Sequence, residues 1–110
     1  EGEKWLEKLP GPYTLILKCN GGVAPNVAPG IGTLGIRIPD HWFSHFVEEL
    51  GIPIVTTSAN KAGEDFMTSL ENLDGEVSNH VEFIVFEGEK HGRPSTLVDL
   101  TGKQAKVIER

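Results

Sequence analysis

The sequence predicts an α/β fold, a twisted and mixed β-sheet with flanking helices. Short apolar runs bounded by Gly, Pro and Asn recur along the chain and are interrupted in two places by segments of helical character. Successive apolar runs without a helix between them should pair antiparallel, because a parallel return needs about a dozen residues or more. Runs separated by a helix can pair parallel, so we expect both directions in one sheet.

Six segments are rich in residues that suit strands, and one short helix is expected near Ser69, where Thr68 and Glu71 have the spacing of a capping box. The expected strands are 13–19, 33–39, 52–56, 81–87, 95–100 and 106–109.

Two further segments have helical character. Residues 5–9, WLEKL, read as the last turns of a helix that stops at Pro10. Residues 41–50 carry an apolar stripe at helical spacing, with Asp40 as the expected N-cap and Gly51 as the C-terminal stop.

Length and composition favour one soluble domain. The chain has 110 residues, 38% hydrophobic and 24% charged, and no apolar run approaches the roughly 18–20 residues that a membrane span needs. The single Cys19 gives no disulfide framework, which fits a reducing cytoplasm.

The net charge of −6 is unevenly distributed. Residues 1–89 hold five basic and fourteen acidic side chains, whereas residues 90–110 hold five basic and two acidic. This balance argues against nucleic-acid binding by bulk electrostatics. A phosphate site would draw on the C-terminal segment, although a solvated surface also explains the imbalance.

Four segments carry more polar groups than packing requires: PGPYT at 10–14, TLGIRIP at 33–39, TTSAN at 56–60 and RPSTLVD at 93–99. Each places these groups at the start or end of an expected strand. Ligands of open α/β sheets bind at strand ends, where side chains and unpaired backbone groups converge.

Arg37 lies within an otherwise apolar expected strand. Burying an unpaired guanidinium would cost several kcal/mol, so Arg37 either faces water from an edge strand or binds a carboxylate or phosphate. Thr33 is four residues earlier and falls on the same face of a strand.

The TTSAN segment offers hydroxyl and amide groups after an apolar run. Thr56 and Ser58 would share one strand face, with Thr57 on the other, and Asn60 can turn the chain or donate its amide to a ligand. A simple turn held by local hydrogen bonds explains the segment equally well.

The remaining candidates are weaker. Ser95 offers a hydroxyl at the start of a strand, and Asp99 is expected to pair with a base or to cap a loop. His41 and His45 stand at i, i+4 but have no third metal ligand at a recognisable spacing, and Cys19 has no evident activating base. No phosphate-loop, nucleophile-elbow or dinucleotide motif is present.

Taken together, these segments resemble the YrdC-like threonylcarbamoyl-AMP synthase family. PGPYT, TLGIRIP, a helix, GIPIVTTSANKAG, GRPSTLVDLT and a closing VIER follow the family's order from about residue 9 to 110. After Asn60 the chain departs from the family pattern and reads KAGEDFMT. The family's N-terminal half, with its Lys-x-Arg pair for the triphosphate, has no match in residues 1–12, so residues 1–110 are expected to be the C-terminal portion of a single, incomplete YrdC-like domain.

The resemblance implies a nucleotidyltransferase that converts L-threonine, bicarbonate and ATP to threonylcarbamoyl-AMP and pyrophosphate for tRNA modification. It also implies that Mg²⁺ accompanies the ATP. It implies no protein nucleophile and no metal ligand. Implied partners are tRNA or double-stranded RNA and the other enzymes of tRNA threonylcarbamoylation, in the cytoplasm and without a membrane. By motif position, the implied ATP contacts are Thr33, Ser58, Asn60 and Arg110, and the implied threonine contacts are Arg37, Thr56 and Ser95.

Two other functions stay open. The carbamoyl-transfer domain of hydrogenase-maturation proteins shares these motifs, and a non-catalytic RNA-binding module would be consistent with the basic C-terminal segment. In the synthase interpretation, the 110-residue chain is not expected to turn over alone, because it lacks the triphosphate-binding Lys and Arg.

Overall fold

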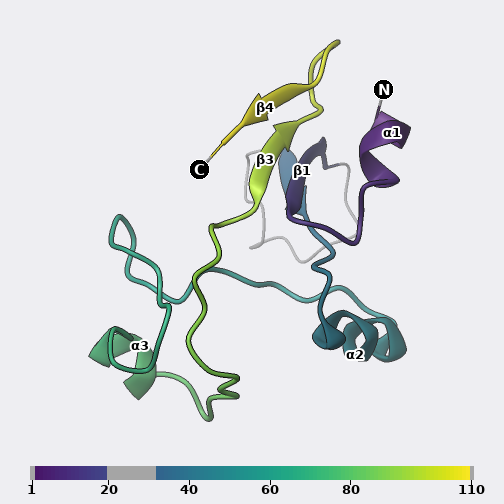
Figure 1. Ribbon diagram of the computed structural model, residues 1–110. Helices are drawn as coiled ribbons and strands as arrows, with labels where there is room; N and C mark the ends of the chain where they lie inside the picture. The colour runs from purple at the N-terminus through teal and green to yellow at the C-terminus, as the bar shows by residue number, and fades with distance from the viewer. Residues whose placement is uncertain (1, 20–31, 110) are drawn as a thin grey trace. The chain divides into compact units, whose positions relative to one another are not determined.

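A computed structural model describes residues 2–19 and 32–109 of the chain (Figure 1). The chain divides into two compact units. Unit 1 comprises residues 1–54 and 93–110, and unit 2 comprises residues 55–92.

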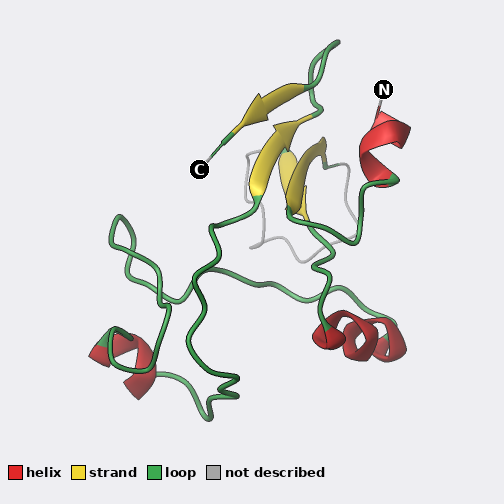
Figure 2. Cartoon of the chain, viewed as in Figure 1, coloured by secondary structure: helices red, strands yellow, loops and turns green. Residues whose placement is uncertain are grey.

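Unit 1 is built on a four-stranded sheet, drawn in yellow in Figure 2. The strands are β1 (Tyr13–Lys18), β2 (Thr33–Ile36), β3 (Thr96–Asp99) and β4 (Lys106–Ile108), in the order β2-β1-β3-β4. β1 and β3 pair parallel, while β2 and β4 pair antiparallel with their neighbours. The predicted mixed sheet is therefore confirmed.

One face of this sheet carries the core of unit 1. Leu15 lies opposite Ile36 on one side and Val98 on the other, and Val98 lies opposite Val107. Leu15 and Val98 have no exposed surface. Alternation along β1 puts Tyr13 on the same face as Leu15. The Tyr13 ring meets the Trp5 ring of α1 (Gly2–Leu6) edge to face at 5.7 Å.

The helix α2 (Trp42–Leu50) begins at Trp42, one residue later than the predicted start at His41. The chain is extended at His41, whose Nδ1 accepts the backbone N–H of Phe43 at 3.1 Å. His41 is thus the N-cap, and the assignment of Asp40 is wrong. Gly51 has a φ of 76° and its N–H donates to the carbonyls of Val47 and Glu48, which confirms the predicted stop.

Two of the six predicted strands do not form. Residues 52–56 and 81–87 do not form strands, and their large apolar side chains are exposed. The exposed fractions of Val55 and Phe83 are 74% and 77%. A strand needs a neighbouring strand to receive its backbone hydrogen bonds. Among the described residues neither segment has one, so a strand-like composition is not sufficient.

The short helix of unit 2 also lies later than predicted. The side chain of Asn72 accepts the backbone N–H groups of Thr68 and Ser69, at 3.0 and 2.9 Å, so these donors are used by a loop and not by a helix. α3 (Gly75–Asn79) begins after Asp74, whose Oδ1 accepts the N–H of Glu76 at 2.8 Å as an N-cap.

The buried row of the sheet predicts a strong position dependence of stability. Leu15→Ala should lower the free energy of unfolding of unit 1 by about 2–5 kcal/mol, because it leaves a cavity between three strands. Leu50→Ala is the matched control, since Leu50 is 52% exposed; its effect should stay within about 0.5 kcal/mol. Urea unfolding measures both, and equal effects would contradict the assignment of Leu15 to the core.

Candidate ligand-binding site

The second face of the sheet carries most of the polar side chains of its four strands, and we call it the Thr14 face. Side chains alternate along a strand, so Thr14, Ile16 and Lys18 of β1 share this face. The strand register adds their neighbours, Thr33 and Gly35 of β2, Leu97 and Asp99 of β3, and Lys106 and Ile108 of β4.

Ser95 joins the Thr14 face through a direct contact. Its hydroxyl shares a 2.5 Å hydrogen bond with the hydroxyl of Thr14, although 81 positions separate the two residues. Ser95 precedes β3 by one residue, as the sequence predicted for a polar strand start. Thr14 was not among the predicted site residues. A hydroxyl side chain between Tyr13 and Leu15, within an apolar strand, is the sequence signal that could have indicated it.

Arg37 follows β2 by one residue and is exposed, so its predicted place inside a strand is wrong. It follows directly on Ile36, the last residue of β2, whereas Thr33 at the other end of that strand lies on the Thr14 face. Among the described residues the Arg37 guanidinium has no ion-pair or hydrogen-bond partner. The segment after Arg37 is held by the N–H of Gly11, which donates to the carbonyl of Ile38 at 2.9 Å.

Asp99 is used within its own loop. Its Oδ1 accepts the hydroxyl of Thr101 at 2.6 Å and the N–H of Thr101 at 2.9 Å. These two hydrogen bonds, with a smaller contribution from the charge of Lys106, hold the pKa of the Asp99 carboxyl below its ordinary value of 3.8 against a small opposing effect of desolvation. The expectation that Asp99 caps a loop is confirmed.

In unit 2, Thr56 and Ser58 are exposed and lie outside any strand. The argument that they share a strand face is therefore wrong, because the segment has no strand geometry to impose the alternation. Asn60, in contrast, is half-buried and holds a turn. Its N–H donates to Ser58 at 3.0 Å, and its Nδ2 donates to the carbonyls of Lys61 and Glu64 at 2.8 and 3.1 Å.

The oxygen of the Asn60 amide takes no part in these turn contacts. Its Oδ1 is buried and has no hydrogen-bond partner within the described part of the chain. Buried acceptors are normally paired, so this oxygen suits an N–H or O–H donor that residues 2–19 and 32–109 do not supply.

A cavity of about 540 Å³ lies next to this turn in unit 2. Three of its lining residues, Glu64, Asp65 and Asp74, are acidic, and the others include Phe66 and Asn72. Three carboxylates disfavour a phosphate group at this place, so we assign the cavity no anionic ligand.

The remaining candidates add no site. Arg110 lies outside the described residues. The Nδ1 of His41 caps α2, and that of His45 lies 3.9 Å from a carboxylate oxygen of Glu48. Residues 2–19 and 32–109 contain no group of three or more His, Cys, Asp or Glu side chains that could hold a metal ion.

Comparison with known families places the chain in one of them. Residues 2–110 match the Sua5/YciO/YrdC family, which is described as telomere recombination. The chain therefore belongs to the Sua5/YciO/YrdC family.

Individual relatives are more informative about chemistry. The chain is 39% identical over 101 residues to a Methanocaldococcus jannaschii protein named as a candidate threonylcarbamoyl-AMP synthase, a match that covers 89% of this chain and 46% of the relative. It is 30% identical over 98 residues to a threonylcarbamoyl-AMP synthase of Vibrio vulnificus, a match that covers 86% of this chain and 52% of the relative. The chain thus spans about half the length of these curated relatives.

A solved structure has the same fold. Sua5 from Pyrococcus abyssi, in a double-alanine variant, superposes with a TM-score of 0.79 at 29% identity, covering 96% of this chain and 34% of that one. The YrdC-like fold class predicted from the sequence is confirmed. In the described part of the chain, every helix is too short or too polar to span a bilayer.

The contact between Gly11 and the segment after Arg37 can be tested by Gly11→Ala. A Cβ at Gly11 would lie 2.5 Å from the carbonyl oxygen of Lys8, so the backbone must shift and the bond to Ile38 should lengthen. We expect a loss of about 1–3 kcal/mol in the free energy of unfolding of unit 1, and faster hydrogen exchange at the residue 11 amide.

Gly92→Ala is the matched control, because a Cβ there meets nothing within 4 Å. If both variants unfold at the same urea concentration as the parent chain, the close approach at Gly11 does not constrain this segment.

The Asp99 loop predicts an acid-sensitive contribution to stability. A carboxyl whose pKa is lowered by folding stabilises the fold above its unfolded pKa, and this contribution is lost as pH falls through the folded pKa. A carbon-detected NMR titration should place the midpoint of Asp99 below 3.8.

Thr101→Val removes the hydroxyl donor and should raise that midpoint, while Thr101→Ser should retain it. A midpoint of Asp99 that does not respond to Thr101→Val would show that the hydroxyl bond is not its cause.

Proposed function

We propose that the chain forms part of a threonylcarbamoyl-AMP synthase. The reaction joins L-threonine, bicarbonate and ATP to give threonylcarbamoyl-AMP, pyrophosphate and water. The observation that carries the proposal is that Thr33 and Ser95 share one face of one sheet, with Arg37 directly after β2, in a chain whose relatives bear that name.

Arg37 and Ser95 suit the amino-acid substrate. A guanidinium can bind a carboxylate through two parallel hydrogen bonds, and the Arg37 group has no competing partner among the described residues. The paired hydroxyls of Thr14 and Ser95 supply further donors and acceptors on the Thr14 face. We assign threonine to Arg37, Ser95 and, from the motif, Thr56.

Asn60 suits the nucleotide. Its unpaired and buried Oδ1 can accept a hydrogen bond from a base amino group or a ribose hydroxyl, and the turn that holds it is fixed by its own Nδ2. We assign ATP to Asn60, Ser58, Thr33 and, from the motif, Arg110. Ser58 is exposed next to this turn.

The reaction does not require a protein nucleophile. Formation of an acyl-adenylate uses an oxygen of the carbamoylated substrate to attack the α-phosphate, with pyrophosphate as the leaving group. The protein contributes mainly by orienting the reactants and stabilising developing charge with fixed donors. The described residues supply such donors in Arg37 and Ser95, while the Nδ2 of Asn60 already donates to Lys61 and Glu64 within its turn.

Mg²⁺ is proposed to accompany ATP. The described residues do not fit a metal cage, since no three potential ligands converge. Magnesium in nucleotide sites is commonly held by substrate phosphates and water with few protein ligands. We therefore assign no residue of this chain to the ion.

We further propose that this chain is the C-terminal portion of one YrdC-like domain, that it acts in the cytoplasm, and that its product serves the enzymes of tRNA threonylcarbamoylation. The match to about half of each curated relative supports a partial domain. The basic balance of residues 90–110 is compatible with transient tRNA contact.

The assignments predict separable effects on two ligands. Arg37→Lys should weaken threonine binding by about 10-fold or more, because it removes a bidentate charged contact, and leave ATP binding nearly unchanged. Asn60→Ala should do the reverse. Lys4→Arg, which also conserves charge and changes an exposed residue of α1, is the control and should change neither affinity. Ligand-induced amide shifts in the ¹⁵N-labelled chain measure the affinity of each variant for threonine and for ATP.

An assay of pyrophosphate release completes the test. The chain alone, with ATP, threonine and bicarbonate, should release no pyrophosphate above background. Rapid release would contradict the partial domain, and a response to carbamoyl phosphate in place of threonine would favour a carbamoyl-transfer enzyme.

A further inference from the structure

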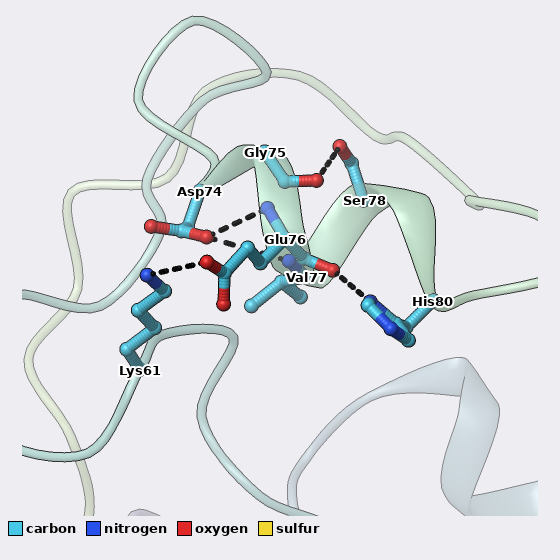
Figure 3. Close-up of polar contacts among 7 residues, drawn as sticks. All are labelled: Lys61, Asp74, Gly75, Glu76, Val77, Ser78 and His80. Atoms are coloured by element: carbon cyan, nitrogen blue, oxygen red, sulfur yellow. Dashed lines mark hydrogen bonds and ion pairs between the residues drawn. The ribbon is translucent and has the colours of Figure 1, made fainter.

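The turn that carries Asn60 is tied to α3 by an ion pair. Lys61 follows Asn60 directly, and its Nζ lies 3.1 Å from Oε1 of Glu76 in the first turn of α3 (Figure 3). The side chain of Lys61 is 41% exposed and that of Glu76 is 73% exposed. The pair therefore connects two segments of unit 2 that are fifteen positions apart in the sequence.

The Glu76 end of this contact is held at both of its backbone polar groups. Its N–H donates to Oδ1 of Asp74 at 2.8 Å, and its carbonyl meets Nδ1 of His80 at 2.6 Å. Ser78 adds a bond from its hydroxyl to the carbonyl of Gly75 at 3.0 Å. Figure 3 shows these bonds along α3, with Lys61 approaching from the neighbouring loop. These bonds thus fix the backbone from which the Glu76 carboxylate reaches Lys61.

The Lys61 end is equally constrained. The carbonyl of Lys61 accepts both Nδ2 of Asn60 at 2.8 Å and the N–H of Glu64 at 3.0 Å. The N–H of Met67 closes the loop on the carbonyl of Ala59 at 3.1 Å. Because the backbone of Lys61 belongs to the Asn60 turn, a restraint on its side chain also restrains the turn.

Charge makes this lysine unusual in its surroundings. Residues 55–92 contain eight Asp and Glu side chains but only two basic ones, Lys61 and Lys90. An ion pair in such a segment offsets repulsion among the carboxylates as well as making its own contact. Lys61 also lies where the chain departs from the family pattern, so family resemblance assigns it no role.

We propose that Lys61, through Glu76, is a positioning residue that fixes the turn bearing Ser58 and Asn60. The proposal rests on the proposed function in one respect, namely that this turn contacts ATP. Lys61 does not itself touch the nucleotide. It limits the conformations of the turn that carries Ser58 and Asn60, so that less ordering of this turn is left for ATP binding.

A charge-swap experiment on the 110-residue chain tests this. The variants are Lys61→Glu, Glu76→Lys and the two together, with Lys61→Arg as the conservative change. Lys90→Glu is the matched control, because it makes the same charge change in unit 2 without breaking the pair. Hydrogen exchange at the Met67 and Glu64 amides reports the turn, and amide shifts on titration with ATP report binding.

Each single reversal should accelerate exchange at both amides and weaken ATP binding by about two- to fivefold, the range of a partly exposed ion pair. The swapped pair and Lys61→Arg should restore both quantities, and Lys90→Glu should leave exchange unchanged. Added salt should reduce the effect of the single reversals.

Two results would overturn the proposal. If exchange does not respond to either reversal, the pair does not fix the turn. If the swapped pair restores exchange but not ATP affinity, Lys61 contacts the nucleotide directly. If the parent chain binds no ATP while the swap still restores exchange, the positioning role stands and the assignment of ATP to this turn fails.

Discussion

The parallel pairing of β1 with β3 is the interaction on which unit 1 depends. It joins residues 13–16 to residues 96–99 and places the two fully buried side chains, Leu15 and Val98, directly opposite each other. The same pairing brings Ser95 to Thr14 on the other face. Packing and the candidate substrate contacts therefore come from one set of backbone hydrogen bonds.

Much of this unit could be predicted from the sequence. Apolar alternation located four of its strands, and Gly51 marked the end of α2 because a left-handed residue is needed there. The spacing of Thr33 and Arg37 predicted that both share one strand face, but β2 ends at Ile36, so its register includes Thr33 and not Arg37. These features follow from local chemistry, which a single sequence contains in full.

The wrong predictions share a physical cause, because they depend on which other segment or side chain supplies a hydrogen-bond partner. Residues 52–56 and 81–87 have strand composition, but composition does not report whether a neighbouring strand exists. Asn72 overrode the expected capping box at Thr68 by accepting its N–H, and Thr14 gained a role from a serine far along the chain. Tertiary contacts of this kind have no periodic signature.

The bond between Thr14 and Ser95 also has a consequence for the order of folding. Its partners are 81 positions apart, so it cannot form until nearly the whole chain has been synthesised. The β1–β2 pairing joins residues that are much closer in the sequence and can form earlier. A ribosome-bound intermediate would then hold β1 with one free edge, and the Thr14 face would be completed last, when β3 arrives.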